Sequence, residues 1–149
     1  MPLVLDASVT LPWFLEDERT GFSDALLDAI HRAEYWAPVV WCLELPNALL
    51  AAERKRRIDR SRRLEAIDQA SRMRIRIDPA LPDMKAISSI ADRHSLSTYD
   101  ASYLELAKRQ GFGLATLDRD LAAAAAAEGI VVQAPGRGGA AQKRRRYNI

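Results

Sequence analysis

The sequence is poor in the residues that build disulfides and zinc sites. It contains one cysteine and two histidines among its 149 residues. A single cysteine excludes an internal disulfide and a cysteine-based zinc site, and the histidines lack the spacing of a zinc-binding helix. Cys42 lies among apolar residues, so we expect it to be a small core residue and not a reactive thiol.

Long apolar runs and a large net charge are also missing. No run approaches the ~20 apolar residues of a membrane span, and the first residues lack the basic segment of a secretory signal. We therefore expect a cytoplasmic protein without membrane association. The net charge is only +2, but basic residues crowd between Arg54 and Arg76 and again near the C-terminus. Such local patches matter more for nucleic-acid binding than the total charge.

Short apolar runs alternate with helical patterns along the chain. The length suits one domain. Runs of this kind, bounded by turn residues, predict buried strands near residues 3–5, 35–37, 74–77, 113–117 and 130–132. Strands that alternate with helices indicate an α/β fold with a mostly parallel central sheet. The composition changes after residue 133, so we expect a domain over 1–133 and a flexible basic tail over 134–149.

Capping residues and apolar spacing place the helices between these strands. Ser8 is the expected N-cap of a short helix, and Ser23 that of a second one. Pro46 should lie in the first turn of a long third helix, which would then begin near Glu44. A fourth helix after Asp59 or Ser61 would complete a hairpin with a basic connection. Further helices are expected over 83–94, 98–111 and 120–129.

Four carboxylates occupy marked positions in this pattern. Asp6 and Asp118 each follow a predicted strand, whereas Glu44 and Asp100 each open a predicted helix. In a parallel sheet, strand ends and the starts of the following helices share one edge, where open α/β sheets bind ligands. All four side chains can therefore converge there. Taken singly, Asp100 and Asp118 are equally well explained as helix N-caps.

Converging carboxylates raise one another's pKa unless a cation compensates them. Mg²⁺ and Mn²⁺ prefer carboxylate and water oxygens, and Mg²⁺ retains waters that a phosphate can replace. A site made of carboxylates alone therefore indicates phosphodiester chemistry with one or two such ions. His31 and His94 are expected to be structural and not catalytic.

Four segments carry a resemblance to a known family. They are Val4-Leu5-Asp6-Ala7-Ser8, Leu45-Pro46-Asn47-Ala48-Leu49, the run from Leu96 to Ala107, and the run from Leu114 to Leu121. In order and spacing the chain resembles the PIN-domain family over residues 2 to 133, most closely the VapC-type toxins of bacterial toxin–antitoxin pairs. The Thr98-Tyr99-Asp100-Ala101 piece and its continuation are the most specific.

The resemblance implies a PIN-like three-layer fold and a metal-dependent ribonuclease. Asp6, Glu44, Asp100 and Asp118 match the family's acidic residues and would bind Mg²⁺ or Mn²⁺, directly or through water. Asn47 would orient Glu44 from one helical turn away. Ser8 and Thr116 match hydroxyl residues with supporting roles. Asp120 would either join the metal site or favour a helix N-terminus, and we prefer the second role.

A negative site repels RNA, so basic residues elsewhere must hold the substrate. The candidates are Arg54, Lys55, Arg56, Arg57, Arg60, Arg62 and Arg63 at the hairpin connection, and Lys143, Arg144, Arg145 and Arg146 in the tail. The resemblance also implies a VapB-type antitoxin, docked on the first helix and the hairpin, and a homodimer. Five aromatic residues are candidates for exposed apolar contacts with such partners, although aromatic residues more often belong to the core. They are Trp13, Phe14, Trp36, Trp41 and Tyr103.

Other functions remain open at this point. A housekeeping RNA-processing nuclease would have the same pattern, and an inactive PIN domain could bind RNA or antitoxin without cleaving. The occupation of all four acidic positions speaks against inactivity. A phospho-acceptor module using Asp6 would need an acidic pair near the N-terminus and a late lysine, which the chain lacks, and it would leave Glu44 and Asp100 unexplained.

Overall fold

The computed structural model describes residues 1–136, and within them a single parallel sheet organises the chain. All its neighbouring strands pair in parallel, in the order β3-β2-β1-β4-β5. The strands are β1 (Leu3–Leu5), β2 (Tyr35–Ala37), β3 (Ile75–Ile77), β4 (Gly113–Ala115) and β5 (Val132–Gln133). This confirms the predicted α/β class and parallel sheet. β1 lies in the centre, and its three residues are buried because helices cover both of its faces.

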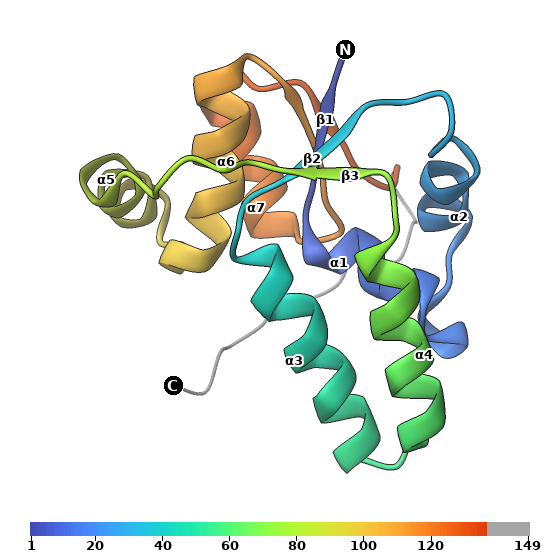
Figure 1. The fold of residues 1–149 in the computed structure, drawn as a ribbon. Helices are drawn as coiled ribbons and strands as arrows, with labels where there is room; N and C mark the ends of the chain where they lie inside the picture. The colour runs from blue at the N-terminus through green and yellow to red at the C-terminus, as the bar shows by residue number, and fades with distance from the viewer. Residues whose placement is uncertain (137–149) are drawn as a thin grey trace.

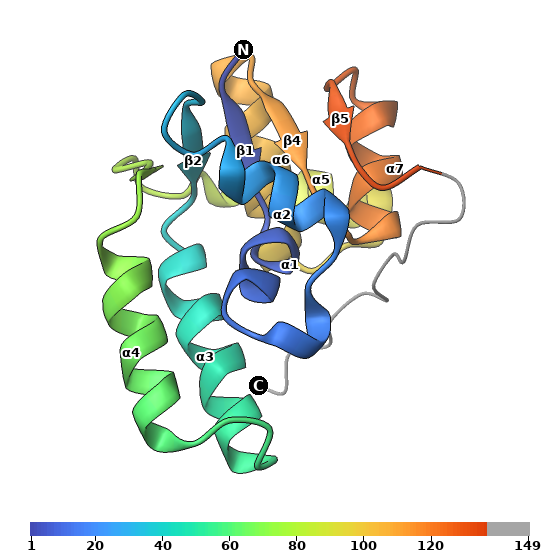
Figure 2. The ribbon, with the colours of Figure 1, turned by 90° about the vertical axis from the view of Figure 1, so that its right-hand side faces the viewer.

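The sheet is the middle of three layers, as Figures 1 and 2 show. Helix α2 (Gly21–Asp28) lies on one side, and α6 (Thr98–Gln110) and α7 (Arg119–Ala127) lie on the other. Adjacent side chains of β2 point to opposite faces of the sheet, because side chains alternate along a strand. The Tyr35 hydroxyl donates to the Leu26 carbonyl of α2, and Trp36 packs against Phe112, just after α6.

The segment after β1 differs in detail from the prediction. Asp6 occupies the N-cap position, and Ser8 lies inside a single turn, α1 (Ala7–Thr10), which continues as η1 (Leu11–Trp13). Pro12 fits in η1 because its first turn needs no proline N–H. After η2 (Glu16–Glu18), Thr20 and not Ser23 caps α2, and the two residues form a reciprocal capping box.

The predicted hairpin is present as α3 (Trp41–Arg54) and α4 (Arg60–Ser71), which extend side by side away from the sheet. The predicted start of α3 is wrong, because Pro46 lies inside the helix. The turn before Pro46 is held by hydrogen bonds that span three residues, in which the Cys42 and Leu43 amides donate to the Val39 and Val40 carbonyls. Pro46 then removes one donor only, and the helix continues through it.

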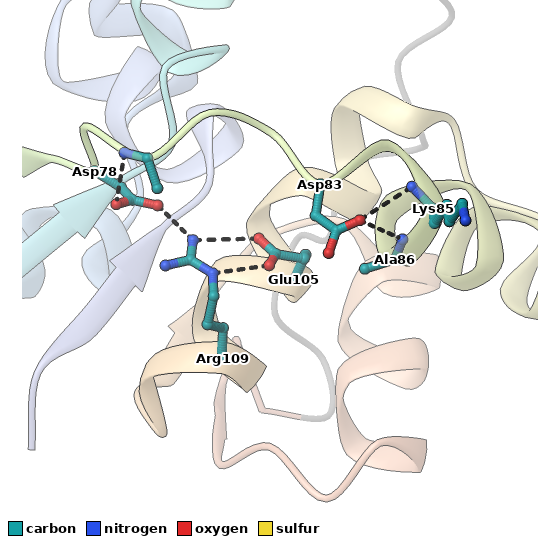
Figure 3. Close-up of polar contacts among 7 residues, drawn as sticks. Asp78, Asp83, Lys85, Ala86, Glu105 and Arg109 are labelled. Atoms are coloured by element: carbon teal, nitrogen blue, oxygen red, sulfur yellow. Dashed lines mark hydrogen bonds and ion pairs between the residues drawn. The ribbon is translucent and has the colours of Figure 1, made fainter.

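The C-terminal helices agree closely with the prediction. They are α5 (Met84–His94), α6 and α7, and their N-caps are Asp83, Ser97 and Asp118. The Asp83 carboxylate accepts from the Lys85 and Ala86 amides, as drawn in Figure 3. Gly111 ends α6 with a φ of 71°, a left-handed conformation that glycine adopts without strain.

Two expectations about burial need correction or qualification. Cys42 is exposed and not in the core, because it lies on the solvent side of the first turn of α3. Trp13, Phe14, Trp41 and Tyr103 are buried, and Trp36 is half-buried. These aromatic side chains are therefore core residues first, and an exposed apolar contact surface must come from other residues.

The proposed boundary near residue 133 falls where the last strand ends, and most of the predicted basic tail, residues 137–149, lies outside the described residues. Within residues 1–136, no helix has the length and apolar character needed to cross a membrane.

Glu128 joins the three C-terminal helices at the end of α7. Its carboxylate accepts from Lys108 of α6 at 2.7 Å, and from Arg93 and His94 of α5 at 3.0 and 2.8 Å. These bonds, with Lys108 and His94 contributing most, lower the pKa of Glu128 from 4.5 to about 2, although partial desolvation opposes them. The carboxylate therefore holds its proton less tightly in the folded chain than in the unfolded chain.

Replacing Glu128 by Gln should lower the melting temperature at neutral pH by roughly 2–4 °C, the effect of ~1 kcal/mol in a chain of this size. Because the folded pKa is depressed, the stabilisation is complete above about pH 4.5 and is lost as the pH falls towards 2. Melting curves of wild type and variant should converge over that interval. Glu16→Gln, at an exposed η2 position without an ion pair in residues 1–136, is the control; a difference that persists at pH 2 would contradict the assignment.

Candidate carboxylate site

The carboxyl edge of the sheet gathers the four predicted carboxylates. Asp6 follows β1 directly, Asp118 follows β4, and Glu44 lies on α3 after β2; these three strands are neighbours in the sheet. Asp100 lies in the first turn of α6, whose N-terminus faces the same edge (Figure 1). The side chains of Asp6, Glu44, Asp100 and Asp118 belong to residues that are only 4–6% exposed. Burial of four acidic residues at one edge is unusual for ordinary surface carboxylates.

Asp6 is oriented by two hydroxyl groups. Its Oδ2 atom accepts hydrogen bonds from Ser8 Oγ at 2.6 Å and from Thr116 Oγ1 at 2.8 Å. The two hydroxyl oxygens are 3.4 Å apart, and Ser8 Oγ also accepts from the Leu117 amide. The predicted supporting residues thus connect the end of β1 to the turn after β4. They hold the Asp6 carboxylate in one orientation.

Asp118 belongs to the same network and also caps α7. Its amide donates to Thr116 Oγ1 at 2.9 Å, while its Oδ1 accepts from the amides of Asp120 and Leu121. The N-cap interpretation of Asp118 is therefore correct, but it does not exclude a second role. One carboxylate oxygen serves the cap, and the other oxygen remains available for a ligand.

Asp100 is not an N-cap. Ser97 caps α6 by accepting from the Asp100 amide, so the capping explanation does not account for the buried Asp100 side chain. Glu44 lies one turn into α3, on the side that carries the buried Trp41, Leu45 and Leu49. Neither residue is where a solvated carboxylate would lie, and the apolar stretch around Glu44 positions it at the sheet edge.

Tyr103 connects these carboxylates in space, and the sequence interpretation did not include it in the site. It lies one helical turn after Asp100 and is fully buried. Burial raises the pKa of its phenol well above 10, and the charges of Glu44, Asp6 and Asp100 raise it further. The hydroxyl therefore lies within the electrostatic reach of three carboxylates from three elements. The spacing of three residues from Asp100 was the signal that could have identified it.

Two predicted supporting residues lie at the margin of the site. Asn47 is exposed, and its role in orienting Glu44 stays a prediction. Asp120 is exposed in the first turn of α7, a position where a carboxylate favours the helix dipole.

A fifth carboxylate at this edge is already compensated. Asp78 follows β3 and is buried, but it pairs with Arg109 of α6, which also bonds to Glu105, as Figure 3 shows. The bonds to Glu105 and Asp78 raise the pKa of Arg109 far above its ordinary value. Asp78 is thus neutralised by a cation of the protein itself, and it is a structural residue that ties β3 to α6.

The donor set of the edge suits a hard divalent cation. Carboxylate and hydroxyl oxygens are the ligands that Mg²⁺ and Mn²⁺ prefer, and thiolate or imidazole ligands are absent from the cluster. Within residues 1–136, no three acidic, histidine or cysteine side chains already surround one point as metal ligands. Mg²⁺ is commonly bound by one or two carboxylates and several waters, so the residues present fit such an ion.

The basic residues of the hairpin that are predicted to bind RNA lie apart from this edge. Arg54, Lys55 and Arg56 are exposed where α3 ends, about ten residues and roughly 15 Å of helix beyond Glu44. Arg57 is paired with Asp17 and Glu18 of η2. Arg144 and Arg145 lie outside the described residues. A cavity of about 630 Å³ at the opposite edge of the sheet contains Arg32, Arg74 and Arg76, which the sequence interpretation did not single out as a group.

Comparison with protein-family models identifies the fold. The model of the PIN domain matches residues 3–127, which is most of the chain. The chain belongs to the PIN-domain family. PIN domains are generally nucleases that use divalent metal ions. The match covers all four carboxylates and Tyr103, and it confirms the resemblance found in the sequence.

Solved structures agree with this assignment. PAE2754 from Pyrobaculum aerophilum is 26% identical, with a TM-score of 0.64 over 89% of this chain and 83% of that one. FitAcB from Neisseria gonorrhoeae is 17% identical, with a TM-score of 0.63 and coverage of 87% and 95%. VapBC2 from Rickettsia felis, bound to a DNA fragment from their promoter, is 10% identical, with a TM-score of 0.66 and coverage of 90% and 98%. No curated protein sequence matches the chain. The last two similarities concern the fold alone.

Asp118→Ala should destabilise the protein by about 1 kcal/mol because it removes the α7 cap, whereas Asp118→Asn, which keeps a capping oxygen, should cost only a few tenths. Urea unfolding at pH 7 measures both values. Asp59, the exposed N-cap of α4, bonds the Arg62 amide and provides the matched control pair, Asp59→Ala and Asp59→Asn. Equal destabilisation by Asp118→Asn and Asp118→Ala would show that the fold requires the charge and not the cap.

Proposed function

We propose that this PIN protein is a Mg²⁺-dependent endoribonuclease and the toxin of a VapBC-type toxin–antitoxin pair. The observation that carries the proposal is the convergence of Asp6, Glu44 and Asp100 around the buried Tyr103 phenol, with Asp118 joined to Asp6 through Thr116. A nuclease site needs carboxylates that are buried, oriented and close together. The cytoplasm, where cellular RNA is accessible, is the proposed location.

Asp6, Glu44, Asp100 and Asp118 are the residues that would hold Mg²⁺ or Mn²⁺, directly or through water. When bound, such an ion activates water and neutralises charge on the scissile phosphate. Ser8 and Thr116 keep the Asp6 carboxylate in place by donating to its Oδ2 atom. The α7 cap in the same way restrains Asp118, so that the ligands need little reorganisation during the reaction.

RNA has to be held against the repulsion of this acidic edge. Arg54, Lys55 and Arg56 are exposed and make no ion pair within residues 1–136, so their charges are available to phosphates. Arg57 is less suitable because Asp17 and Glu18 compensate it. We propose that RNA crosses from the edge along α3 to the end of the hairpin. The tail arginines Arg144 and Arg145 remain further predicted contacts.

An antitoxin partner is proposed from the VapC-type resemblance of the sequence. The structures named FitAcB and VapBC2 have the same fold, and the second is a complex on promoter DNA. In this chain, α1 and the α3–α4 hairpin lie beside the carboxyl end of β1 (Figure 2). A segment of an antitoxin docked on these elements would cover the acidic residues, and a basic side chain from it would compensate their charge.

A homodimer is proposed on a surface that differs from the one expected from the aromatic residues. Four large exposed hydrophobic residues lie around the starts of two helices: Val39 precedes α3 and Leu43 lies in its first turn, while Leu81 precedes α5 and Met84 begins it. Val39 and Leu81 also line a cavity of about 50 Å³ with Pro38 and Pro82. Exposed apolar residues grouped in this way are typical of interaction sites, and a second copy of the chain is the proposed occupant.

Asp6→Asn and Asp100→Asn should each reduce RNA cleavage by at least ~100-fold, because each removes a negative ligand while preserving its shape. Purified protein without antitoxin is incubated with a mixed RNA pool in Mg²⁺ or in EDTA, and the 5′ ends of the products are mapped. EDTA should abolish cleavage by wild type. Asp92→Asn, an exposed acid on α5, is the control and should cleave like wild type.

Equal cleavage by wild type and the site variants would exclude the proposed site. No cleavage by either protein would favour an inactive PIN domain that binds RNA or antitoxin. Growth arrest on expression, relieved by a small protein from a neighbouring reading frame, separates a toxin from a housekeeping nuclease, which would cleave RNA without arresting growth.

The double substitution of Leu43 and Leu81 by Asp should convert the dimer into a monomer in sedimentation velocity. Both residues are exposed, Leu43 to 69% and Leu81 to 92%, so the monomer should retain its fold by circular dichroism. Leu64→Asp, at an exposed position on α4, should leave the dimer intact. A wild-type protein that sediments as a monomer throughout the measured concentration range would contradict the dimer.

A further inference from the structure

The Tyr103 hydroxyl is a buried donor whose contact with the Glu44 carboxylate falls short of a normal hydrogen bond within residues 1–136. The side chain is fully buried on α6, and its oxygen has no partner at ordinary hydrogen-bond geometry within residues 1–136, although the Glu44 side chain lies close enough to raise its pKa. Buried hydroxyl groups almost always have a partner, and an exception in a folded protein needs an explanation such as an absent water or ion. A phenylalanine would fill the same space without that cost. The hydroxyl therefore indicates a ligand.

Tyr35 shows what a structural tyrosine looks like in the same core. It is as deeply buried as Tyr103, but its hydroxyl donates to the Leu26 carbonyl of α2 at 2.7 Å. That bond joins β2 to the helix that covers it. Burial also raises the pKa of Tyr35, as it does for Tyr103. The two residues differ in what their hydroxyl groups face: Tyr35 faces a backbone acceptor, and Tyr103 faces the carboxylate edge.

The position of Tyr103 explains this orientation. It lies three residues after Asp100, so both side chains leave α6 on the same side, towards the end of β1. The charge of Glu44 acts on the phenol more strongly than those of Asp6 and Asp100. Glu44 belongs to α3, a different element from the α6 helix that carries Tyr103. The hydroxyl thus lies between ligands from different elements, where it could orient one of them.

We propose that Tyr103 is a positioning residue, whose hydroxyl donates to the Glu44 carboxylate, directly or through one ordered water, when a divalent cation is bound at the carboxylate edge. This inference rests on the proposed function, because it requires the metal site. A neutral donor suits this place, since it orients a carboxylate without replacing the cation as its charge partner. Partners of this kind fix ligand geometry and typically change metal affinity by roughly 10–100-fold.

The test compares Tyr103→Phe with Tyr35→Phe in the full chain, using Mn²⁺ as the probe. Each substitution removes one hydroxyl oxygen from a buried ring and changes nothing else. Mn²⁺ affinity is measured by titration calorimetry and by the EPR signal of free Mn²⁺. Thermal unfolding is recorded in EDTA, so that the stability of the metal-free protein is obtained independently.

Tyr103→Phe should weaken Mn²⁺ binding by roughly 10–100-fold, while its melting temperature in EDTA stays equal to or above that of wild type. Tyr35→Phe should show the opposite pattern, with unchanged affinity and a lower melting temperature, because it loses an existing hydrogen bond.

Unchanged Mn²⁺ affinity in Tyr103→Phe would overturn the positioning role while leaving the metal site intact. A loss of stability in EDTA equal to that of Tyr35→Phe would also overturn it, since the hydroxyl would then have a partner in the metal-free fold. Absence of Mn²⁺ binding by wild type would overturn the proposed metal site itself, and this outcome is distinguishable from the other two.

Discussion

Mutual repulsion among buried carboxylates is the constraint on which the candidate site depends. Parallel pairing of β2, β1 and β4 brings their carboxyl ends to one edge, and acidic residues follow two of these strands or lie on the helix after the third. The fold tolerates this arrangement in part through local hydrogen bonds, since hydroxyl and amide donors stabilise Asp6 and Asp118. The remaining electrostatic cost is what a bound cation would relieve.

Residues of the site serve the fold and the proposed chemistry together. Thr116 bonds to Asp6 and receives the Asp118 amide, so it joins the turn after β4 to the end of β1. Asp118 caps α7 with one oxygen. Such double use gives the carboxylates fixed positions without additional structure. It also means that an alanine variant confounds stability with activity, whereas asparagine separates them.

Charge is distributed so that each acidic residue at the sheet edge has a different environment. Asp78 is compensated by Arg109, and Asp120 faces solvent at a helix N-terminus. Asp6, Glu44 and Asp100 instead surround a neutral phenol, while the exposed cations of the α3–α4 connection lie at the far end of the hairpin. The separation of acidic edge and basic end suits a polyanion that is bound in one place and cleaved in another.

The sequence determined the elements, because apolar runs, caps and glycine stops are local signals: the five strands, the hairpin and the last three helices were all predicted within a few residues. It also marked the four acidic positions and, through their spacing, the family. Tertiary structure decided what spacing cannot express. Pro46 lies inside α3 because preceding carbonyls hold the first turn, and Cys42 and Asn47 face solvent because of the direction in which α3 leaves the sheet. Above all, only packing shows that Asp78 has Arg109 as its partner and that Tyr103 lies among the carboxylates, since both facts depend on residues far apart in the chain.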